Sequence, residues 1–215
     1  MTCCNGPECP GTNKFFTRFS SKYAKRFRRK GLEKVQLHIL KGIGRVPVPS
    51  AEVLDIGCGV GALHIALLRE GAVRATGVDA AEGMIKQARA FAEKHGVQER
   101  VNYVLGDFTS MAADLPSADI TILDKVVCCY ENVDELVSRS MEKTRRVYAM
   151  SMPRERAIVR WGFLTQIFIS KLFKAAFTPY WHDWNDLRTS ITSRGFRLVY
   201  ENSTFLWNIV VFERL

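Results

Sequence analysis

The sequence predicts an α/β protein built on a Rossmann-like, doubly wound sheet of about seven strands, mostly parallel with a C-terminal antiparallel hairpin. Three observations predict it. From residue 52 onward, short apolar segments alternate with segments of helical periodicity. A glycine-rich turn at residues 57–61 follows the first apolar segment. Only a short turn separates the last two strands, and such a turn favours antiparallel pairing.

The individual elements follow from the spacing of apolar residues and from the glycines that end helices. The expected strands are residues 53–56, 75–78, 101–105, 120–123, 147–150, 197–202 and 206–213. The expected helices are residues 14–30, 32–43, 62–70, 81–95 and 131–142, followed by a helix that Asp183 caps and Gly195 ends. Strands and helices in this order imply parallel strands joined by right-handed crossovers.

Charge divides the chain into a basic N-terminal helical arm, residues 1–50, and a main domain, residues 51–215, with a helical insert at about 154–182. Nine Lys or Arg and one acid lie between Lys14 and Lys34, whereas the rest of the chain is nearly neutral. An aromatic stripe recurs every four residues in this basic segment: Phe15, Phe19, Tyr23 and Phe27. The arm is interpreted as a lid whose stripe packs on the sheet, or as a contact, through residues 14–34, with nucleic acid or an acidic membrane surface.

Composition favours an ordinary globular domain. The chain has 215 residues, 47% of them apolar and 25% charged, with a net charge of +9. The N-terminus is polar and then basic, and no run of about 18 apolar residues occurs, so we expect a cytoplasmic protein without a spanning helix. Free thiols are expected because no secretion signal accompanies the six cysteines. Cys3, Cys4 and Cys9 lack zinc spacing, so no metal is expected; a soft-metal site joining them to Cys128 or Cys129 is the alternative.

A candidate ligand loop runs from Asp55 to Gly61. Its glycines let a ligand approach the backbone, and the helix that follows offers unpaired N–H groups. With Ala62 in the last place, the loop also satisfies the dinucleotide pattern G-x-G-x-x-G/A. One interpretation of this loop is therefore that the protein is a nicotinamide-dependent oxidoreductase.

Three carboxylates favour a different ligand. Asp79 lies 20 residues after Gly59, where an acid binds ribose hydroxyls. Asp55 would repel a pyrophosphate but attract a methionyl ammonium group and a nearby sulfonium. Asp107, expected at the end of the third strand, can accept a hydrogen bond from the amine of adenine. All three are expected at one edge of the sheet, where open parallel sheets bind ligands.

The runs VLDIGCGVGALHIAL, GVDAAEGMIKQA, VLGDF and ILDKVV resemble the class I S-adenosylmethionine-dependent methyltransferases over about residues 51–150. The hairpin GFRLVYENSTFLWNIVVFERL resembles the strand pair that closes their sheet. The resemblance implies S-adenosylmethionine as the cofactor. The residues that it implies for cofactor binding are Asp55, Gly57, Cys58, Gly59, Gly61, Asp79, Ala80, Met84, Asp107, Phe108, Asp124 and Lys125.

The segment LDKVVCCYENVDELV is similar to small bacterial magnesium-protoporphyrin O-methyltransferase-like proteins. The expected reaction is direct displacement on a small or flat apolar acceptor, because the insert and the N-terminal arm are expected to wall an apolar pocket. A porphyrin-like carboxylate is the leading candidate. Tyr130 and His182 are the candidate catalytic residues, although a histidine flanked by tryptophans is also typical of simple packing. The apolar insert, which contains Trp161, is expected to roof the acceptor pocket; padding of the domain or docking of a second subunit are the alternatives.

Overall fold

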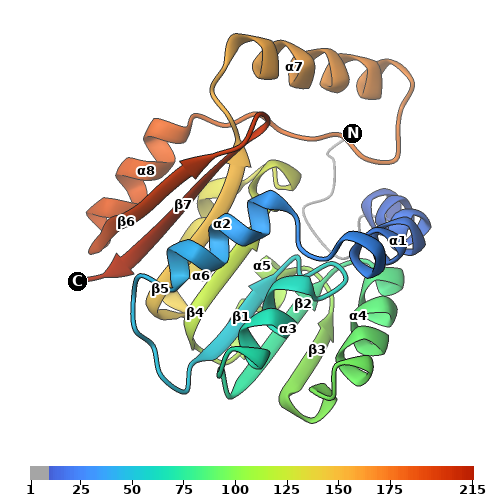
Figure 1. The fold of residues 1–215 in the computed structure, drawn as a ribbon. Coiled ribbons are helices and arrows are strands. Elements are labelled where there is room, and N and C mark those ends of the chain that lie inside the picture. Colours follow the sequence, from blue (N-terminus) through green and yellow to red (C-terminus); the bar gives the residue numbers. More distant parts are fainter. Residues whose placement is uncertain (1–9) are drawn as a thin grey trace.

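The computed structural model describes residues 10–215, which contain one seven-stranded sheet in the order β3-β2-β1-β4-β5-β7-β6 (Figure 1). Only β7 runs antiparallel to its neighbours, β5 and β6. The strands are β1 (Glu52–Ile56), β2 (Arg74–Asp79), β3 (Val101–Leu105), β4 (Ala118–Asp124), β5 (Thr144–Pro153), β6 (Phe196–Ser203) and β7 (Trp207–Arg214). The predicted doubly wound, mostly parallel sheet with a C-terminal antiparallel hairpin is confirmed.

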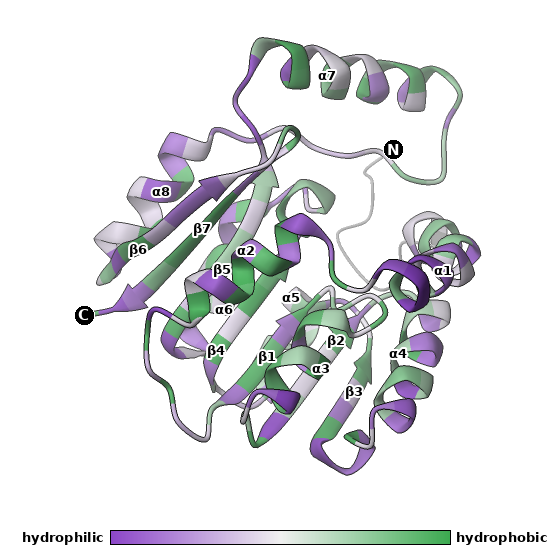
Figure 2. Cartoon of the chain, in the orientation of Figure 1, coloured by the Kyte–Doolittle hydropathy of each residue, from purple (hydrophilic) through white to green (hydrophobic). Residues whose placement is uncertain are grey.

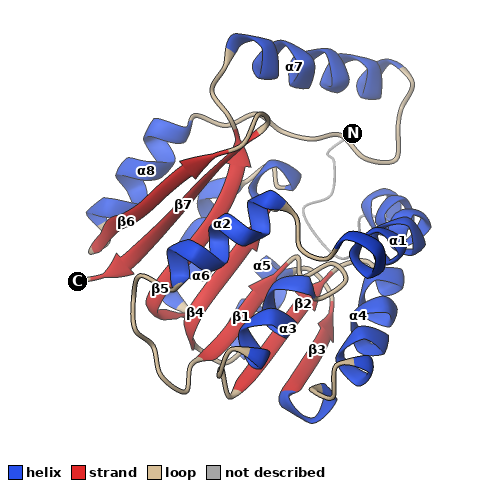
Figure 3. Cartoon of the chain, in the orientation of Figure 1, coloured by secondary structure: helices blue, strands red, loops and turns tan. Residues whose placement is uncertain are grey.

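Helices cover both faces of the sheet (Figure 3). The helices are α1 (Pro10–Lys30), α2 (Lys34–Ile43), α3 (Ala62–Arg69), α4 (Glu82–Lys94), α5 (Phe108–Met111), α6 (Val133–Glu142), α7 (Ala157–Leu172) and α8 (Trp184–Ser193). Successive residues of a strand point to opposite faces, so the apolar β1 supplies Val53 to one core and Leu54 and Ile56 to the other. Both faces are buried, as expected for a parallel sheet between two helical layers.

The strand order reverses direction between β1 and β4, which are neighbours in the sheet. Three carboxylates, Asp55 near the end of β1, Asp79 in β2 and Asp124 in β4, therefore reach the same carboxyl edge on adjacent strands. This is the place where open α/β sheets bind ligands.

Some element boundaries differ from the sequence prediction because side chains cap the helices. Glu33 and Gln36 form a capping box, so α2 begins at Lys34 rather than at residue 32. Asn132 caps α6 by accepting a hydrogen bond from the Glu135 backbone, which moves its start to Val133. The expectation that Asp107 ends the third strand is wrong: β3 ends at Leu105, and the Asp107 carboxylate caps the short α5.

The arm helix α1 packs on α4, not on the sheet as the stripe predicted. Ser20 and Ala24 are buried in this contact, and the Gly83 backbone donates to Oγ1 of Thr17 at 3.2 Å. Within the stripe, Tyr23 is 43% exposed. The physical reason is periodicity: a spacing of four residues advances about 40° beyond a full turn, so the stripe winds around the helix instead of following one face.

The insert contains a shorter helix than expected, α7, and continues as an irregular segment from residue 173 to α8. In Figure 1, α7 lies apart from the layers, beyond the carboxyl edge of β5. Val159 and Ser170 are its buried side chains, and the half-buried Phe163 contacts the rings of Trp181 and Trp207. Figure 2 shows apolar residues along much of the helix. Within residues 10–215, no helix combines the length and apolarity that crossing a bilayer requires.

Candidate cofactor and acceptor site

A pocket of about 220 Å³ opens at the carboxyl edge of the sheet, between the strand ends and α1. It brings together every residue predicted to bind the cofactor except Gly61, and it includes Tyr130 but not His182. The structure adds several residues that the sequence did not assign to the cofactor site. They are Thr12, Phe16, Tyr23, Glu33, Gln36, Val60, Leu63, Val78, Gly106, Val126 and Cys129, with Ala62 of the glycine pattern. No residue of α7 lines the pocket, contrary to the expectation that the insert roofs it.

The glycine loop depends on backbone conformations that favour glycine. Gly57 and Gly59 have φ angles of 64° and 55°. A Cβ on Gly57 would lie 2.4 Å from Cγ2 of Val126, whereas a Cβ on Gly59 would meet nothing within 4 Å. Gly59 therefore presents bare backbone to the pocket. Gly61, with φ of 83°, is the N-cap residue directly before α3, so it contributes to the turn into the helix.

Asp55 is anchored from behind by a buried chain of polar side chains. Its Oδ2 atom lies 2.7 Å from Nδ1 of His64, whose Nε2 atom lies 2.9 Å from the Tyr103 hydroxyl. The Tyr103 hydroxyl donates in turn to the carbonyl of Ala88 at 3.1 Å. Burial raises the pKa of Tyr103 well above its usual value, so the phenol stays protonated. Asp55 therefore meets the pocket with a fixed orientation, through partners from α3, β3 and α4.

Asp79 is held by the backbone of the two loops beside it. Gly59 N–H donates to one carboxylate oxygen and Ala81 N–H to the other, both at 2.8 Å. Burial raises the pKa of Asp79 to about 6, although both backbone hydrogen bonds favour the charged form. A ligand that donates hydroxyl groups to this carboxylate would stabilise its charged form further.

The Asp107 carboxylate already accepts hydrogen bonds from several neighbouring residues. The Thr109 hydroxyl and the backbone N–H and hydroxyl of Ser110 donate hydrogen bonds to its Oδ2 atom, while the Tyr130 hydroxyl donates to Oδ1 at 2.6 Å. Burial, followed by the charge of Asp107, raises the pKa of Tyr130 well above its usual range. Tyr130 is therefore a neutral hydrogen-bond donor at physiological pH, and its orientation is set by Asp107.

His182 lies behind Tyr130 rather than at the pocket wall. Its Nε2 atom is 2.9 Å from the Tyr130 carbonyl oxygen, and its ring is half-buried. Burial lowers the pKa of His182, so the ring is neutral at pH 7. This geometry lets His182 position the backbone of Tyr130; a catalytic role for either side chain stays a prediction.

The arm reaches the pocket through a polar network that the sequence did not predict. The Lys125 ammonium group lies 2.6 Å from Glu33, which also pairs with Arg26 of α1. The Gln36 amide donates to Asp124 at 3.3 Å, and Ser151 donates to the other Asp124 oxygen at 2.7 Å. Glu33 is the one acid between Lys14 and Lys34, and this isolation was the available signal. The network connects both N-terminal helices to the end of β4.

Two of the thiols within the described residues, Cys58 and Cys129, are held in the protonated form. Burial raises the pKa of Cys58, and a hydrogen bond with Cys128 together with burial raises that of Cys129. Residues 10–215 contain no cluster of three or more His, Cys, Asp or Glu side chains arranged for a metal ion. The other proposed participants in a soft-metal site, Cys3, Cys4 and Cys9, lie outside the described residues.

The charges of the pocket fit a cationic ligand. Among the lining residues, five carry carboxylates (Glu33, Asp55, Asp79, Asp107 and Asp124), and only Lys125 carries a positive charge. A pyrophosphate would face these carboxylates, whereas an ammonium and a sulfonium group would be attracted by them. These negatively charged acceptors therefore fit S-adenosylmethionine better than a nicotinamide dinucleotide.

Comparison with known proteins gives the same class. Residues 53–149 match the methyltransferase domain family. The structure is also similar to that of magnesium protoporphyrin IX methyltransferase from Synechocystis PCC 6803, crystallised with bound SAH. The similarity covers 95% of this chain and 100% of that chain, with a TM-score of 0.67 and 22% sequence identity. Residues 53–149 thus form a methyltransferase domain, and the chain has the fold of the class I S-adenosylmethionine-dependent methyltransferases. S-adenosylmethionine is the cofactor of this class.

Curated relatives match the domain but differ in their acceptors. The ubiquinone biosynthesis O-methyltransferase of Xylella fastidiosa (strain 9a5c) is 38% identical over 84 residues, which are 39% of this chain and 31% of that protein. The ribosomal protein L11 methyltransferase of Dechloromonas aromatica (strain RCB) is 30% identical over 126 residues, 50% of this chain and 40% of that protein. The chain therefore spans less than half the length of these relatives.

Proposed function

We propose that the chain transfers a methyl group from S-adenosylmethionine, by direct displacement, to a small or flat apolar acceptor, with a porphyrin-like carboxylate as the leading candidate. The observation that carries this proposal is the composition of the pocket. Asp55, Asp79 and Asp124 lie at the strand edge, while α1 and the segment before α6 add Phe16, Tyr23, Cys129 and Tyr130. The pocket thus combines carboxylates that attract a cation with aromatic side chains that suit a planar acceptor.

The residues of the chain would chiefly bind and orient. Asp79 would hold the ribose hydroxyls, Asp55 the methionyl ammonium group, and the Gly57–Gly61 loop the backbone-facing side of the ligand. When bound, the cofactor supplies a methyl group activated by its sulfonium. Asp124 and Lys125 would lie beside the methyl donor, and proximity and alignment would account for most of the acceleration. An ionised carboxylate acceptor would need no strong base, which agrees with the protonated state of Tyr130.

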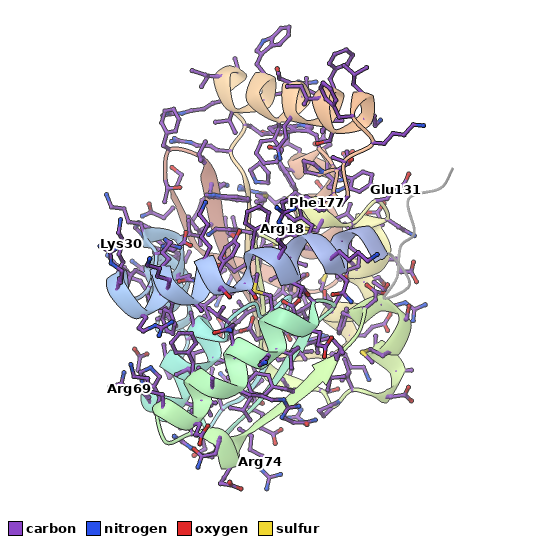
Figure 4. All side chains as sticks on the ribbon, turned by 90° about the vertical axis from the view of Figure 1, so that its right-hand side faces the viewer. Arg18, Lys30, Arg69, Arg74, Glu131 and Phe177 are labelled. Atoms are coloured by element: carbon purple, nitrogen blue, oxygen red, sulfur yellow. The ribbon has the colours of Figure 1, made fainter. Side chains whose placement is uncertain are left out.

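The arm would act as a wall that excludes water. Thr12, Phe16 and Tyr23 of α1 line the pocket, and Phe16 contacts the ring of Phe177 from the insert. Figure 4 shows α1 across this face of the molecule, with Phe177 close to it. Removing α1 would open the pocket to solvent, so acceptor turnover should suffer more than cofactor binding.

The proposal is tested by incubating the full chain with methyl-labelled S-adenosylmethionine and, separately, magnesium protoporphyrin IX, a catechol and a ribosomal protein extract. We expect base-labile label, as a methyl ester gives, on the porphyrin alone. Label on the catechol or on protein, with none on the porphyrin, would refute the porphyrin-like acceptor. Phe16→Ala should raise the KM for the accepted porphyrin, whereas Phe205→Ala, an exposed position outside the pocket lining, should not.

A further inference from the structure

Within residues 10–215, no segment covers the outward face of α7, which is apolar. Ile158, Trp161, Phe168 and Leu172 recur at spacings of three, seven and four residues, which places them on one face of a helix. They are 67%, 71%, 68% and 63% exposed, and Phe173 follows at 75%. Side chains project from α7 away from the sheet (Figure 4). Exposed apolar surface of this extent is typical of an interaction site.

A second apolar segment lies beside the start of α7. The Arg154 backbone donates to the carbonyl of Leu206 at 2.8 Å, and this bond brings the β6–β7 turn next to the helix. Phe205 in that turn is 62% exposed. Two segments about 40 residues apart in sequence therefore leave large apolar side chains in solvent at the same end of the molecule.

The charged residues of α7 itself are all basic. From residue 156 to residue 182 the chain has no Asp or Glu. Arg156 and Arg160 lie exposed near the start of α7, and Lys171 and Lys174 lie exposed near its end. Residues 10–32, which include α1, are also free of acids. Figure 4 labels two of the basic positions of α1, Arg18 near the middle of the helix and Lys30 at its C-terminal end.

We infer that the outward face of α7 docks on an anionic lipid bilayer, with the helix lying in the plane of the interface. Aromatic and aliphatic side chains would enter the headgroup–acyl boundary, and the flanking Arg and Lys would pair with lipid phosphates. The helix has 16 residues, about 24 Å at 1.5 Å per residue, which is too short to span and long enough to lie on the surface. This inference does not depend on the identity of the methyl acceptor.

A second copy of the chain fits the surface less well. Two α7 helices packed face to face would bring Arg160 and Lys171 of both copies together without any acid from either helix. The net charge of +9 would oppose such a contact further. Anionic headgroups provide the opposite charge that the protein surface lacks.

Sedimentation with vesicles and tryptophan fluorescence test the inference. The full chain should sediment with phosphatidylcholine vesicles that contain phosphatidylglycerol, and its emission should shift to the blue. Trp161 is more exposed than Trp181, Trp184 or Trp207, so Trp161→Phe should abolish the shift but keep sedimentation. The double variant Trp161→Ser with Phe168→Ser should weaken vesicle binding at least about tenfold, because two large apolar side chains no longer enter the bilayer.

The matched control is Leu37→Ser with Val73→Ser, which changes two apolar residues that are 52% and 41% exposed elsewhere and should leave binding unchanged. Equal binding by wild type and the Trp161/Phe168 variant would overturn the inference and assign any binding to basic residues alone. Failure of the wild type to bind anionic vesicles would overturn it as well. A dimer that the Trp161/Phe168 variant converts to monomer, without vesicle binding, would make the surface a contact between copies.

Discussion

The Glu33–Lys125 ion pair, which joins the arm to the pocket, should affect binding of S-adenosylmethionine more than binding of S-adenosylhomocysteine. The Glu33 and Lys125 side chains are each 24% exposed, and their charged atoms lie 2.6 Å apart. Glu33→Gln would leave the Lys125 charge unneutralised in a pocket built for a cation. Repulsion between the unpaired Lys125 ammonium group and the sulfonium of the ligand would cost the binding free energy on the order of 1 kcal/mol after solvent screening, or about fivefold in affinity. S-adenosylmethionine carries a sulfonium that S-adenosylhomocysteine lacks, so affinity for the former should fall by more.

Isothermal titration calorimetry with both ligands measures this difference. Lys125→Met in the Glu33→Gln background should restore much of the lost selectivity for S-adenosylmethionine, because it removes the freed charge. Glu52→Gln is the matched control: its pair with Arg145 has a 2.8 Å separation at side chains that are 40% and 49% exposed, and neither residue lines the pocket. The reasoning is refuted if Glu33→Gln weakens both ligands equally, or if Glu52→Gln has the same effect.

Three further outcomes are expected. Asp79→Ala should weaken S-adenosylhomocysteine binding by roughly 1–3 kcal/mol in calorimetry. In the wild type, affinity should level off about one pH unit above the Asp79 pKa of about 6 and fall toward tenfold per pH unit below that pKa, since hydroxyl donors favour the charged form of the carboxylate. Gly57→Ala should abolish cofactor binding while the far-ultraviolet circular dichroism stays native, because the new Cβ meets Val126 in a left-handed backbone; tight binding by this variant would contradict the loop geometry. His64→Ala should lower the free energy of unfolding by about 3 kcal/mol in denaturant titration, because Asp55 and Tyr103 lose a buried partner; a loss under about 1 kcal/mol would show that the chain of hydrogen bonds contributes little.

The sequence could predict the sheet and the strand-edge carboxylates because these depend on local patterns. Short apolar runs define the strands, and Asp55, Asp79 and Asp124 each lie at or near the end of one. Once the strands are parallel, their carboxyl ends must share an edge. The glycine turn is equally local, since its residues are contiguous and their backbone conformations favour glycine.

The rest of the site depends on contacts between distant segments. Glu33 and Lys125 are 92 residues apart, and Gln36 and Asp124 are 88 apart. Nothing in the periodicity of either segment indicates the other. The packing face of α1 was likewise obscured, because its large aromatic residues outnumber the small Ser20 and Ala24 that permit close contact with α4. The apolar content of α7 predicts a buried helix, but the structure leaves one apolar face of this helix exposed to solvent.

The central claim is that the pocket at the carboxyl edge binds S-adenosylmethionine rather than a nicotinamide dinucleotide. Calorimetric titration of the full chain with S-adenosylhomocysteine and with NADH measures this directly. The acidic lining and the glycine loop predict saturable binding of one S-adenosylhomocysteine per chain and no measurable heat with NADH. Saturable binding of NADH without binding of S-adenosylhomocysteine would contradict the account.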